Sequence, residues 1–277
     1  MNMVDERFEC AAVIFRFAGY WEFGGLELDY QKEVAEVFAK FAEHETVKYA
    51  KELDFSYDKV LKFAVHIEKV DGKFVFIEDI QSLFGNWNQE NSKKFLELFN
   101  KFYIDTNYEE FFNSHMELYE EYTQKFVDET YGKIDFEWFG KYVDPSNLRC
   151  IYSLSSGNYG ATVNDKIVYC CVFGNGGAVV HEYCHSFGNK LADKWYNENA
   201  EFKKWCDDSV DAEKMPWYNS GWGMGCEYIV RAYSILYRIQ HGAGAEEWLA
   251  IERDFGFIYI REVYNMILNL EEKNETN

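Results

Sequence analysis

The sequence has few of the residues that break a chain into loosely linked parts, and few positive charges. It contains 2 prolines in 277 residues, and no Pro-, Gly- or Ser-rich linker, which argues against disorder and against a flexible string of domains. Lys and Arg total 28 against 48 Asp and Glu, so the formal net charge is -20. Phosphate binding needs a basic surface, so this balance disfavours a nucleic-acid partner. No stretch approaches the roughly 18 apolar residues of a membrane-spanning helix, so we expect no membrane span.

The 7 cysteines are irregularly spaced, and no Cys-x-x-Cys pair is present. This pattern disfavours both a disulfide framework and a zinc site made of cysteines alone. We therefore expect reduced, mostly buried thiols. The N-terminus lacks a basic segment followed by a long apolar stretch. The expectation is a cytoplasmic protein as the sequence stands, or a secreted one if a leader peptide has been removed.

Hydrophobic spacing predicts an α+β protein that is mainly helical and has a small β-sheet. The first apolar run, residues 8–18, fits a strand or a helix equally well. We expect a helical N-terminal scaffold over residues 1–145 and a catalytic region over residues 146–277, or one compact unit. The expected helices are 28–41, segments of 91–127, a helix around 178–195, 226–240 and 258–270; the expected strands lie within 60–76, with a hairpin turn at Asp71-Gly72, and at 150–154 and 167–173.

An HExxH sequence, His181-Glu182-Tyr183-Cys184-His185, lies inside the helix expected around residues 178–195. At 3.6 residues per turn, His181 and His185 lie on one face and can converge on a single Zn²⁺. Glu182 then lies beside the metal site, where a carboxylate can take a proton from water as general base. The alternative is a surface helix that carries two histidines by chance.

A catalytic zinc site needs a third protein ligand. Position 191 is Leu, so the sequence departs from the HExxHxxGxxH pattern of metzincins. Glu227 is the preferred third ligand, because its predicted helix is otherwise strongly apolar and a buried carboxylate needs a partner. Asp193 and Cys226 are rival ligands. The alternative for Glu227 is the preference of acidic residues for a helix N-terminus, with an ion pair to Arg231 four residues later.

Two histidines, a motif glutamate and a later helical glutamate form the gluzincin arrangement. The segments HEYCHSFGN, EYIVRAY and FGFIYIREVY, with FAKFAEHETV and SGNYG upstream, resemble a bacterial family of uncharacterised zinc metallopeptidases over nearly the whole chain. The resemblance implies a zincin-like catalytic half, with His181, His185 and Glu227 as zinc ligands and Glu182 as general base. It does not supply a substrate.

The surroundings of the expected site differ from those of better-known gluzincins, which often have Asn before the ligand glutamate and Asp four residues after it. Here these positions are Cys226 and Arg231, so other residues must orient the ligand histidines. The candidates for that role are Asn189 and Asp193. The candidates for stabilising an oxyanion during peptide hydrolysis are Arg231, Tyr159, Tyr259 and Tyr264.

The preferred hypothesis is a zinc-dependent peptidase of the gluzincin type that acts on a peptide or protein substrate. Two alternatives stay open. One is a non-catalytic module that binds peptides or glycans through its aromatic residues, which make up 19% of the chain, and carries a structural or vestigial metal site. The other is a metal-dependent hydrolase of a non-peptide amide, which the same four residues could serve.

Overall fold

The structure is a computed structural model that describes residues 2–53, 57–78, 82–84, 87–164, 166–211, 213–216 and 218–275. It is an α+β fold in which helices predominate, as predicted. The chain forms two compact units, described separately below: residues 1–134 with 147–179, and residues 135–146 with 180–277. None of the helices in the described ranges has the length and hydropathy needed to cross a membrane.

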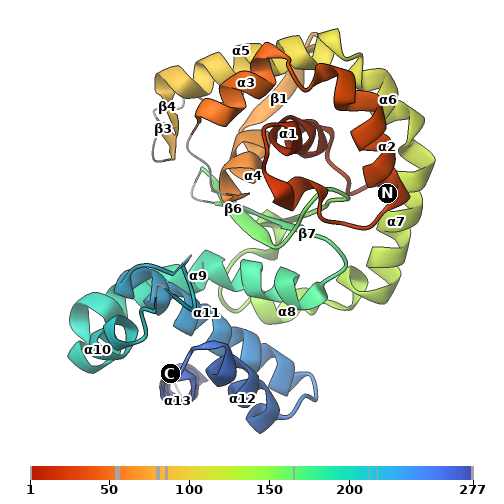
Figure 1. Ribbon diagram of the computed structural model, residues 1–277. Coiled ribbons are helices and arrows are strands. Elements are labelled where there is room, and N and C mark those ends of the chain that lie inside the picture. The colour runs from red at the N-terminus through yellow and green to blue at the C-terminus, as the bar shows by residue number, and fades with distance from the viewer. Residues whose placement is uncertain are drawn as a thin grey trace. The chain divides into compact units, whose positions relative to one another are not determined.

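The first unit is built around helix α1, Glu6–Phe17, which is almost entirely buried. Figure 1 shows α1 end-on, with the other helices of this unit arranged around it. Asp5 caps the helix by accepting hydrogen bonds from the backbone N–H groups of Arg7 and Phe8. The surrounding helices are α2 (Asp29–Phe38), α3 (Glu45–Glu52), α4 (Tyr57–Val65), α5 (Gln89–Asp105), α6 (Tyr108–Ser114) and α7 (Met116–Glu129).

Three short sheets complete the first unit. The largest has the strand order β5-β7-β6, with β5 (Leu148–Tyr152) parallel and β6 (Tyr159–Val163) antiparallel to β7 (Ile167–Val172). β1 (Ile67–Val70) and β2 (Lys73–Phe76) form the predicted hairpin, and both turn residues, Asp71 and Gly72, have positive φ. A third pair joins β3 (Ser82–Phe84) to β4 (Trp87–Asn88).

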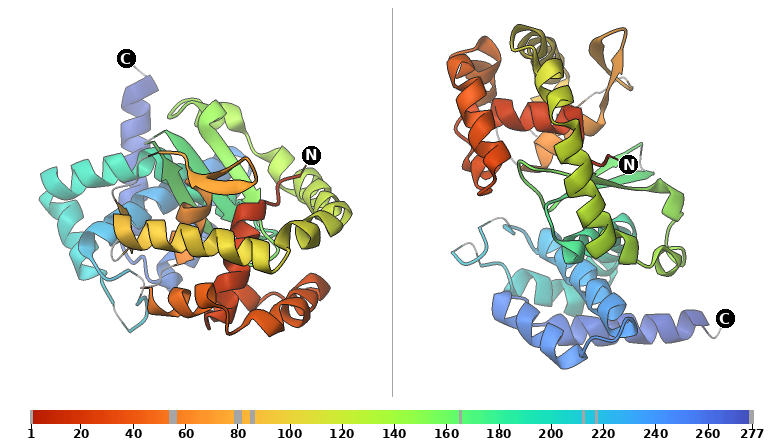
Figure 2. Two further views of the ribbon diagram at one scale, coloured as in Figure 1. Left: turned by 90° about the horizontal axis from the view of Figure 1, so that it is seen from above. Right: turned by 90° about the vertical axis from the view of Figure 1, so that its right-hand side faces the viewer.

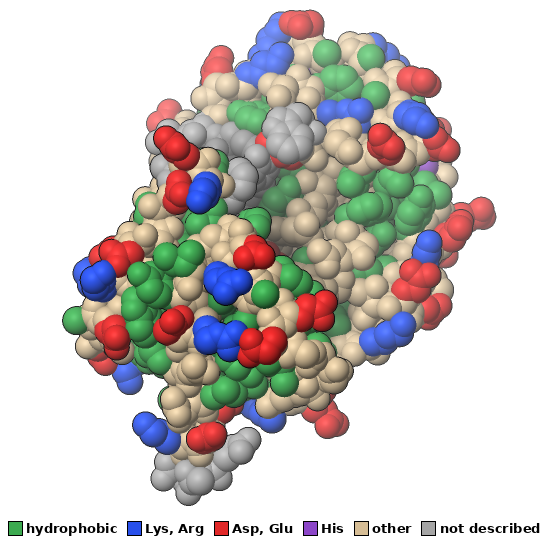
Figure 3. All heavy atoms as spheres, turned by 60° about the horizontal axis from the view of Figure 1, so that its bottom comes forward, with side chains coloured by type: hydrophobic (Ala, Val, Ile, Leu, Met, Phe, Trp, Pro, Cys, Tyr) green, Lys and Arg blue, Asp and Glu red, His purple; other side chains and the backbone are tan. Residues whose placement is uncertain are grey.

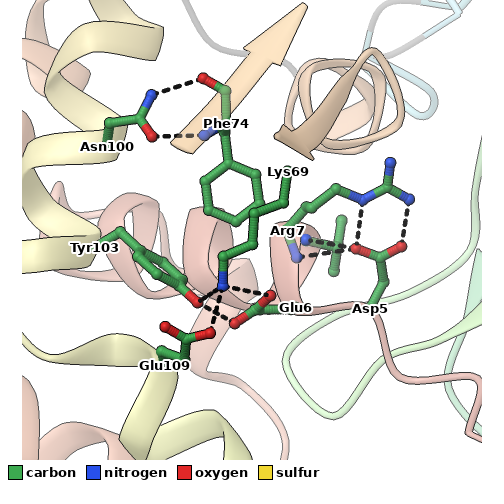
Figure 4. A network of polar contacts seen from close by, with 9 residues as sticks. Asp5, Glu6, Arg7, Lys69, Phe74, Asn100, Tyr103 and Glu109 are labelled. Atoms are coloured by element: carbon green, nitrogen blue, oxygen red, sulfur yellow. Dashed lines mark hydrogen bonds and ion pairs between the residues drawn. The ribbon is translucent and has the colours of Figure 1, made fainter. Parts of the chain in front are cut away.

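A polar network fixes the hairpin against the helices of the first unit (Figure 4). The Lys69 ammonium group on β1 donates to the Tyr103 hydroxyl of α5 and to the Glu109 carboxylate of α6, each at 2.7 Å. Tyr103 in turn donates to Glu6 on α1. The Asn100 side chain pairs with both backbone groups of Phe74 on β2. One lysine thus links three elements that are far apart in the sequence.

The second unit is helical. Its helices are α8 (Phe136–Phe139), the part of α9 (Gly176–Glu198) from Val180 onward, α10 (Ala200–Asp208), α11 (Gly221–Gln240), α12 (Ala245–Phe255) and α13 (Ile260–Glu275). α11 packs against α10, α12 and α13, and Figure 2 shows these helices from two further directions. Twelve of its residues are buried, so α11 is the central helix of this unit.

Several expected elements differ from the structure. Residues 60–65, expected as strand, are the end of helix α4, in which Val60, Leu61, Phe63 and Ala64 are fully buried. The turn-rich segment 155–165 contains strand β6, and α10 and α12 were not expected. The division into units also differs from the expected boundary between residues 145 and 146. Residues 147–179 group with the N-terminal helices, because the Tyr152 N–H donates to the Met3 carbonyl and β6 packs on α4.

All 7 cysteines are free thiols, in line with the expectation of a reduced set. On the face shown in Figure 3, the described Asp and Glu side chains lie among Lys and Arg side chains, and no continuous basic area is visible there.

Candidate metal centre

The HExxH sequence forms two turns of helix α9, as its spacing predicts. Asn175 begins the helix, since its side-chain oxygen accepts from the N–H groups of Gly177 and Ala178. The His181 and His185 rings lie on one face with centroids 5.0 Å apart. On another face Phe187 stacks on Tyr142, with centroids 4.4 Å apart and planes at 13°. Aromatic packing therefore fixes the rotation of α9 within the second unit.

Glu227 lies on α11 and faces both histidines. Its Oε2 atom is 3.5 Å from His181 Nε2, and its Oε1 atom is 3.5 Å from His185 Nε2. Among the residues that the structure describes, His181, His185 and Glu227 form the one group whose ligand atoms all lie within 4.8 Å of one another in a geometry suited to a metal ion. Glu227 is thus brought to the motif, whereas the rivals Asp193 and Cys226 are not part of this group.

A close crossing of α9 and α11 brings the three ligands together. A Cβ atom built on Gly188 would lie 3.1 Å from Val230 Cγ2 and 3.4 Å from Ile229 Cγ2. Any larger residue at position 188 would meet side chains of α11, so glycine permits the close approach. Helix α11 begins at Gly221, capped by Ser220, rather than near Cys226 as expected. Glu227 therefore lies in the second turn, and a preference of acidic residues for the helix N-terminus does not explain its position.

The protonation states of the group suit a cation. The His185 Nδ1 atom is 2.9 Å from Asn189 Oδ1, an oxygen that only accepts, so Nδ1 carries the proton. In the neutral ring, the Nε2 lone pair then faces Glu227. Burial, together with the charges of its neighbours, lowers the pKa of His181 to about 3, so this ring is neutral near pH 7. Neutral imidazole is the form that binds metals.

Glu227 remains an anion in spite of its burial. Burial would raise the pKa of the carboxyl, but the two histidines, Arg231 and a hydrogen bond from Tyr218 lower it below its ordinary value. Its Oε2 atom is fully buried and makes no hydrogen bond within the described chain. The lone pairs of two imidazole nitrogens and the negative charge of a carboxylate repel one another when they face. The arrangement is stable only when a cation or a proton lies between these groups.

Zn²⁺ fits this donor set. Bond lengths of about 2.0–2.2 Å in a tetrahedral site place neighbouring ligand atoms about 3.3–3.6 Å apart. The two nitrogen-to-oxygen distances of 3.5 Å fall in this range without any rearrangement. Two imidazole nitrogens and one carboxylate oxygen are also the ligand types found in catalytic zinc sites.

The remaining candidates divide into those near the group and those placed elsewhere. Glu182 follows His181 on α9 and is buried. Asn189 binds His185, as expected of a residue that orients a ligand. Asp193 instead accepts from the indole N–H of Trp222 at 3.3 Å and contacts neither ligand histidine in the described structure. Cys226 is buried, and burial, with the nearby Glu227 charge, raises the pKa of its thiol to about 12.

The Arg231 guanidinium makes several contacts inside the protein. Its Nη1 atom donates to Glu252 at 2.6 Å, its Nη2 atom donates to the Tyr218 hydroxyl at 3.3 Å, and its Nε atom lies 3.3 Å from Glu227. The predicted ion pair with Glu227 is present. Two of the five N–H groups of the guanidinium thus donate inside the protein, and the role of Arg231 in stabilising an oxyanion stays a prediction.

The three tyrosine candidates are not among the described contacts of the metal-ligand group. Tyr159 begins strand β6 of the first unit, where its hydroxyl bonds to Ser156. The Tyr259 ring stacks on Trp205, with centroids 5.7 Å apart, and Tyr264 is buried on α13. Tyr218 is the tyrosine that contacts Glu227 and Arg231, and the sequence analysis did not single it out. It lies nine residues before Glu227 with no motif around it, so nothing in the sequence distinguishes it from the 20 other tyrosines.

Comparison with known proteins adds no relative: no protein-family profile, no curated protein and no solved structure matches this chain. The resemblance to bacterial zinc metallopeptidases therefore stays a prediction, and a functional conclusion must rest on the geometry of the metal-ligand group.

Proposed function

We propose that the protein is a zinc-dependent peptidase of the gluzincin type, with His181, His185 and Glu227 as metal ligands. The observation that carries the proposal is the convergence of two imidazoles and one buried carboxylate, in which each carboxylate oxygen lies 3.5 Å from one imidazole nitrogen. A site made only for stability would gain more from apolar packing, because the cost of burying a carboxylate can exceed the gain from its ion pair with Arg231.

Bound zinc would supply positive charge that polarises a water molecule and the carbonyl of a peptide bond. The chain itself supplies a proton acceptor. Glu182 is 9% exposed, adjoins His181 on the same helix and is not a member of the metal-ligand group. In this role Glu182 accepts the proton of the attacking water and passes it to the leaving amine.

The three ligands and Glu182 support hydrolysis of an amide bond as the proposed reaction. Hydrolysis of a peptide bond needs a polarised carbonyl, an activated water and a proton donor for the leaving amine. We propose a peptide or protein as substrate, and the charge of -20 makes a nucleic acid an unsuitable one.

The first test is the metal content of the purified protein, measured by elemental analysis after reconstitution with zinc chloride and removal of excess metal. We expect about one zinc per chain in the wild type and loss of that zinc in Glu227→Ala, because two histidines alone bind zinc weakly. Asp193→Ala and Cys226→Ser serve as matched controls and should retain the metal. Zinc that persists in Glu227→Ala but is lost in either control would contradict the ligand set, and a wild type that binds no zinc would overturn the proposed function.

A further inference from the structure

A guanidinium group stands directly behind the candidate metal ligand Glu227. Arg231 follows Glu227 by one turn of α11, and its Nε atom lies 3.3 Å from Glu227 Oε2. Both side chains are mostly buried, with 15% and 12% of their surfaces exposed. Neither of these two atoms makes a hydrogen bond within the described chain, so their attraction is one of charge and proximity.

Arg231 is held in this position from three other directions. Glu252 on α12 accepts from Nη1 at 2.6 Å and is itself only 15% exposed. The Tyr218 hydroxyl accepts from Nη2 at 3.3 Å. The guanidinium also lies over the Phe257 ring, 4.3 Å from its centroid, and over the Phe255 ring, at 5.1 Å. These contacts come from α12 and from the segments next to α11 and α12, so the guanidinium is fixed by residues distant from it in sequence.

Tyr218 connects to both members of the pair. The Tyr218 hydroxyl accepts from Arg231, and Tyr218 is one of the groups that lower the pKa of the Glu227 carboxyl. His181 and Arg231 both lie next to Glu227 Oε2, and His185 lies next to Oε1. A carboxylate restrained in this way cannot rotate freely about its last bond, and each oxygen stays directed at one histidine.

An ion pair with Glu252 does not by itself explain why Arg231 also lies next to Glu227. A guanidinium that only compensated Glu252 would have no reason to present its third nitrogen to Glu227. Glu252 and Tyr218 accept one hydrogen bond each from the guanidinium, which fixes its plane beside Glu227. The contacts with Glu227 therefore require a role toward that carboxylate.

From these contacts we propose that Arg231 is a positioning residue for the metal ligand Glu227, and that Glu252 and Tyr218 hold Arg231 in place. This inference rests on the proposed function. Positioning favours metal binding because the carboxylate is already oriented, whereas the positive charge of Arg231 by itself opposes binding of a dication.

The substitution Arg231→Lys separates these two effects, because lysine keeps the charge but cannot hold Glu227, Glu252 and Tyr218 at once. The measurement is the dissociation constant for Zn²⁺, obtained by competition with a chromophoric chelator, together with the visible spectrum of the Co²⁺-loaded protein. We expect Arg231→Lys to weaken zinc binding about 10- to 100-fold and to alter the Co²⁺ spectrum. Glu252→Gln should act in the same direction by a smaller factor, since Gln still accepts a hydrogen bond but no longer pairs as an ion.

Matched controls exist on the same two helices. Arg238→Lys changes a second arginine of α11, which stacks 3.9 Å over Trp248, and Glu246→Gln removes an exposed ion pair of α12 with Arg261. Both controls should bind zinc within about twofold of wild type, which is the effect expected of changes that leave the ligands oriented. The thermal midpoint of the metal-free proteins is recorded in parallel.

Three outcomes test whether Arg231 positions Glu227. Weaker zinc binding in Arg231→Lys but not in Arg238→Lys supports positioning. An unchanged or tighter dissociation constant in Arg231→Lys, even with a lower thermal midpoint, overturns it and leaves Arg231 as a purely structural residue, while the proposed function stands. Absence of zinc binding in the wild type overturns both.

Discussion

At the scale of single residues, Glu182 separates catalysis from metal binding. It adjoins His181 but is outside the group of ligand atoms. We expect Glu182→Gln to lower the hydrolysis rate of a fluorogenic peptide about 10²- to 10⁴-fold, since the amide cannot accept a proton, while zinc content stays at the wild-type level. The measurement is turnover and elemental analysis of the same preparation.

Glu198→Gln is a suitable control for Glu182, because Glu198 is an exposed carboxylate at the end of the same helix. It should leave both turnover and zinc content unchanged. Zinc lost together with activity in Glu182→Gln would mean that Glu182 is a ligand or a structural residue rather than the general base.

Site residues that share one helix face could be predicted from the sequence. A site residue that lies in a connection between helices could not. The i,i+4 spacing placed His181 with His185 and His185 with Asn189, and both pairs are in contact. Glu227 was predicted as a ligand on a different ground, namely that a carboxylate on an apolar helix needs a partner. Tyr218 belongs to the connection between α10 and α11, and hydrophobic spacing does not encode where a connection places its side chains.

At the scale of elements, the crossing of α9 and α11 determines whether the ligands meet. Gly188 leaves no room for a side chain beside Val230 and Ile229. We expect Gly188→Leu to push the helices apart, to lower the free energy of unfolding by about 1–3 kcal/mol and to weaken zinc binding. Urea unfolding and zinc competition measure the two effects. Lys194→Leu, at an exposed position of α9, should change neither, and a Gly188→Leu protein with wild-type zinc affinity would show that the crossing does not position the ligands.

Glycines misled the prediction of where α11 begins. The segment 221–225 contains Gly221, Gly223 and Gly225, which resembles a loop, yet it forms the first turns of the helix. A Cβ atom on Gly225 would lie 3.3 Å from Cys206 Sγ and 3.4 Å from the Phe202 ring of α10. The glycines allow α10 and α11 to pack closely, so tertiary contact outweighs the low helix propensity of glycine.

At the scale of the whole molecule, contacts distant in sequence decide the division into units. Buried Glu9 on α1 accepts hydrogen bonds from Ser153 Oγ at 2.8 Å, from Leu154 N at 3.0 Å and from Ser155 Oγ at 2.6 Å. These bonds tie the segment after β5 to the first helix. The composition changes near residue 145, and this change suggested a boundary there. Local composition carries no information about a hydrogen bond between residues that are 144 positions apart, such as Glu9 and Ser153.

The stability of the metal-free protein should depend on pH through His181. Burial is the main cause that lowers the pKa of His181 to about 3, and the charges of Glu227, His185, Arg231 and Arg238 modify it. An unfolded histidine has a pKa of about 6.5, so between these values the unfolded chain binds a proton that the folded chain does not. Stability is therefore lost as the pH falls below about 6.5, and His181 should contribute about 2 kcal/mol less at pH 5 than at pH 7.5.

Urea unfolding of the metal-free wild type and of His181→Gln at the two pH values measures this contribution as a difference. Other groups of this acidic chain titrate in the same range, and the difference removes those that both proteins share. We expect the difference in unfolding free energy between the two proteins to shift by about 2 kcal/mol in favour of the variant at pH 5. His241→Gln, at an exposed position of the same unit, should follow the wild type. If His181→Gln and wild type lose stability in parallel, His181 is protonated in the folded protein, and the neutral imidazole required for metal binding is not present in the absence of metal.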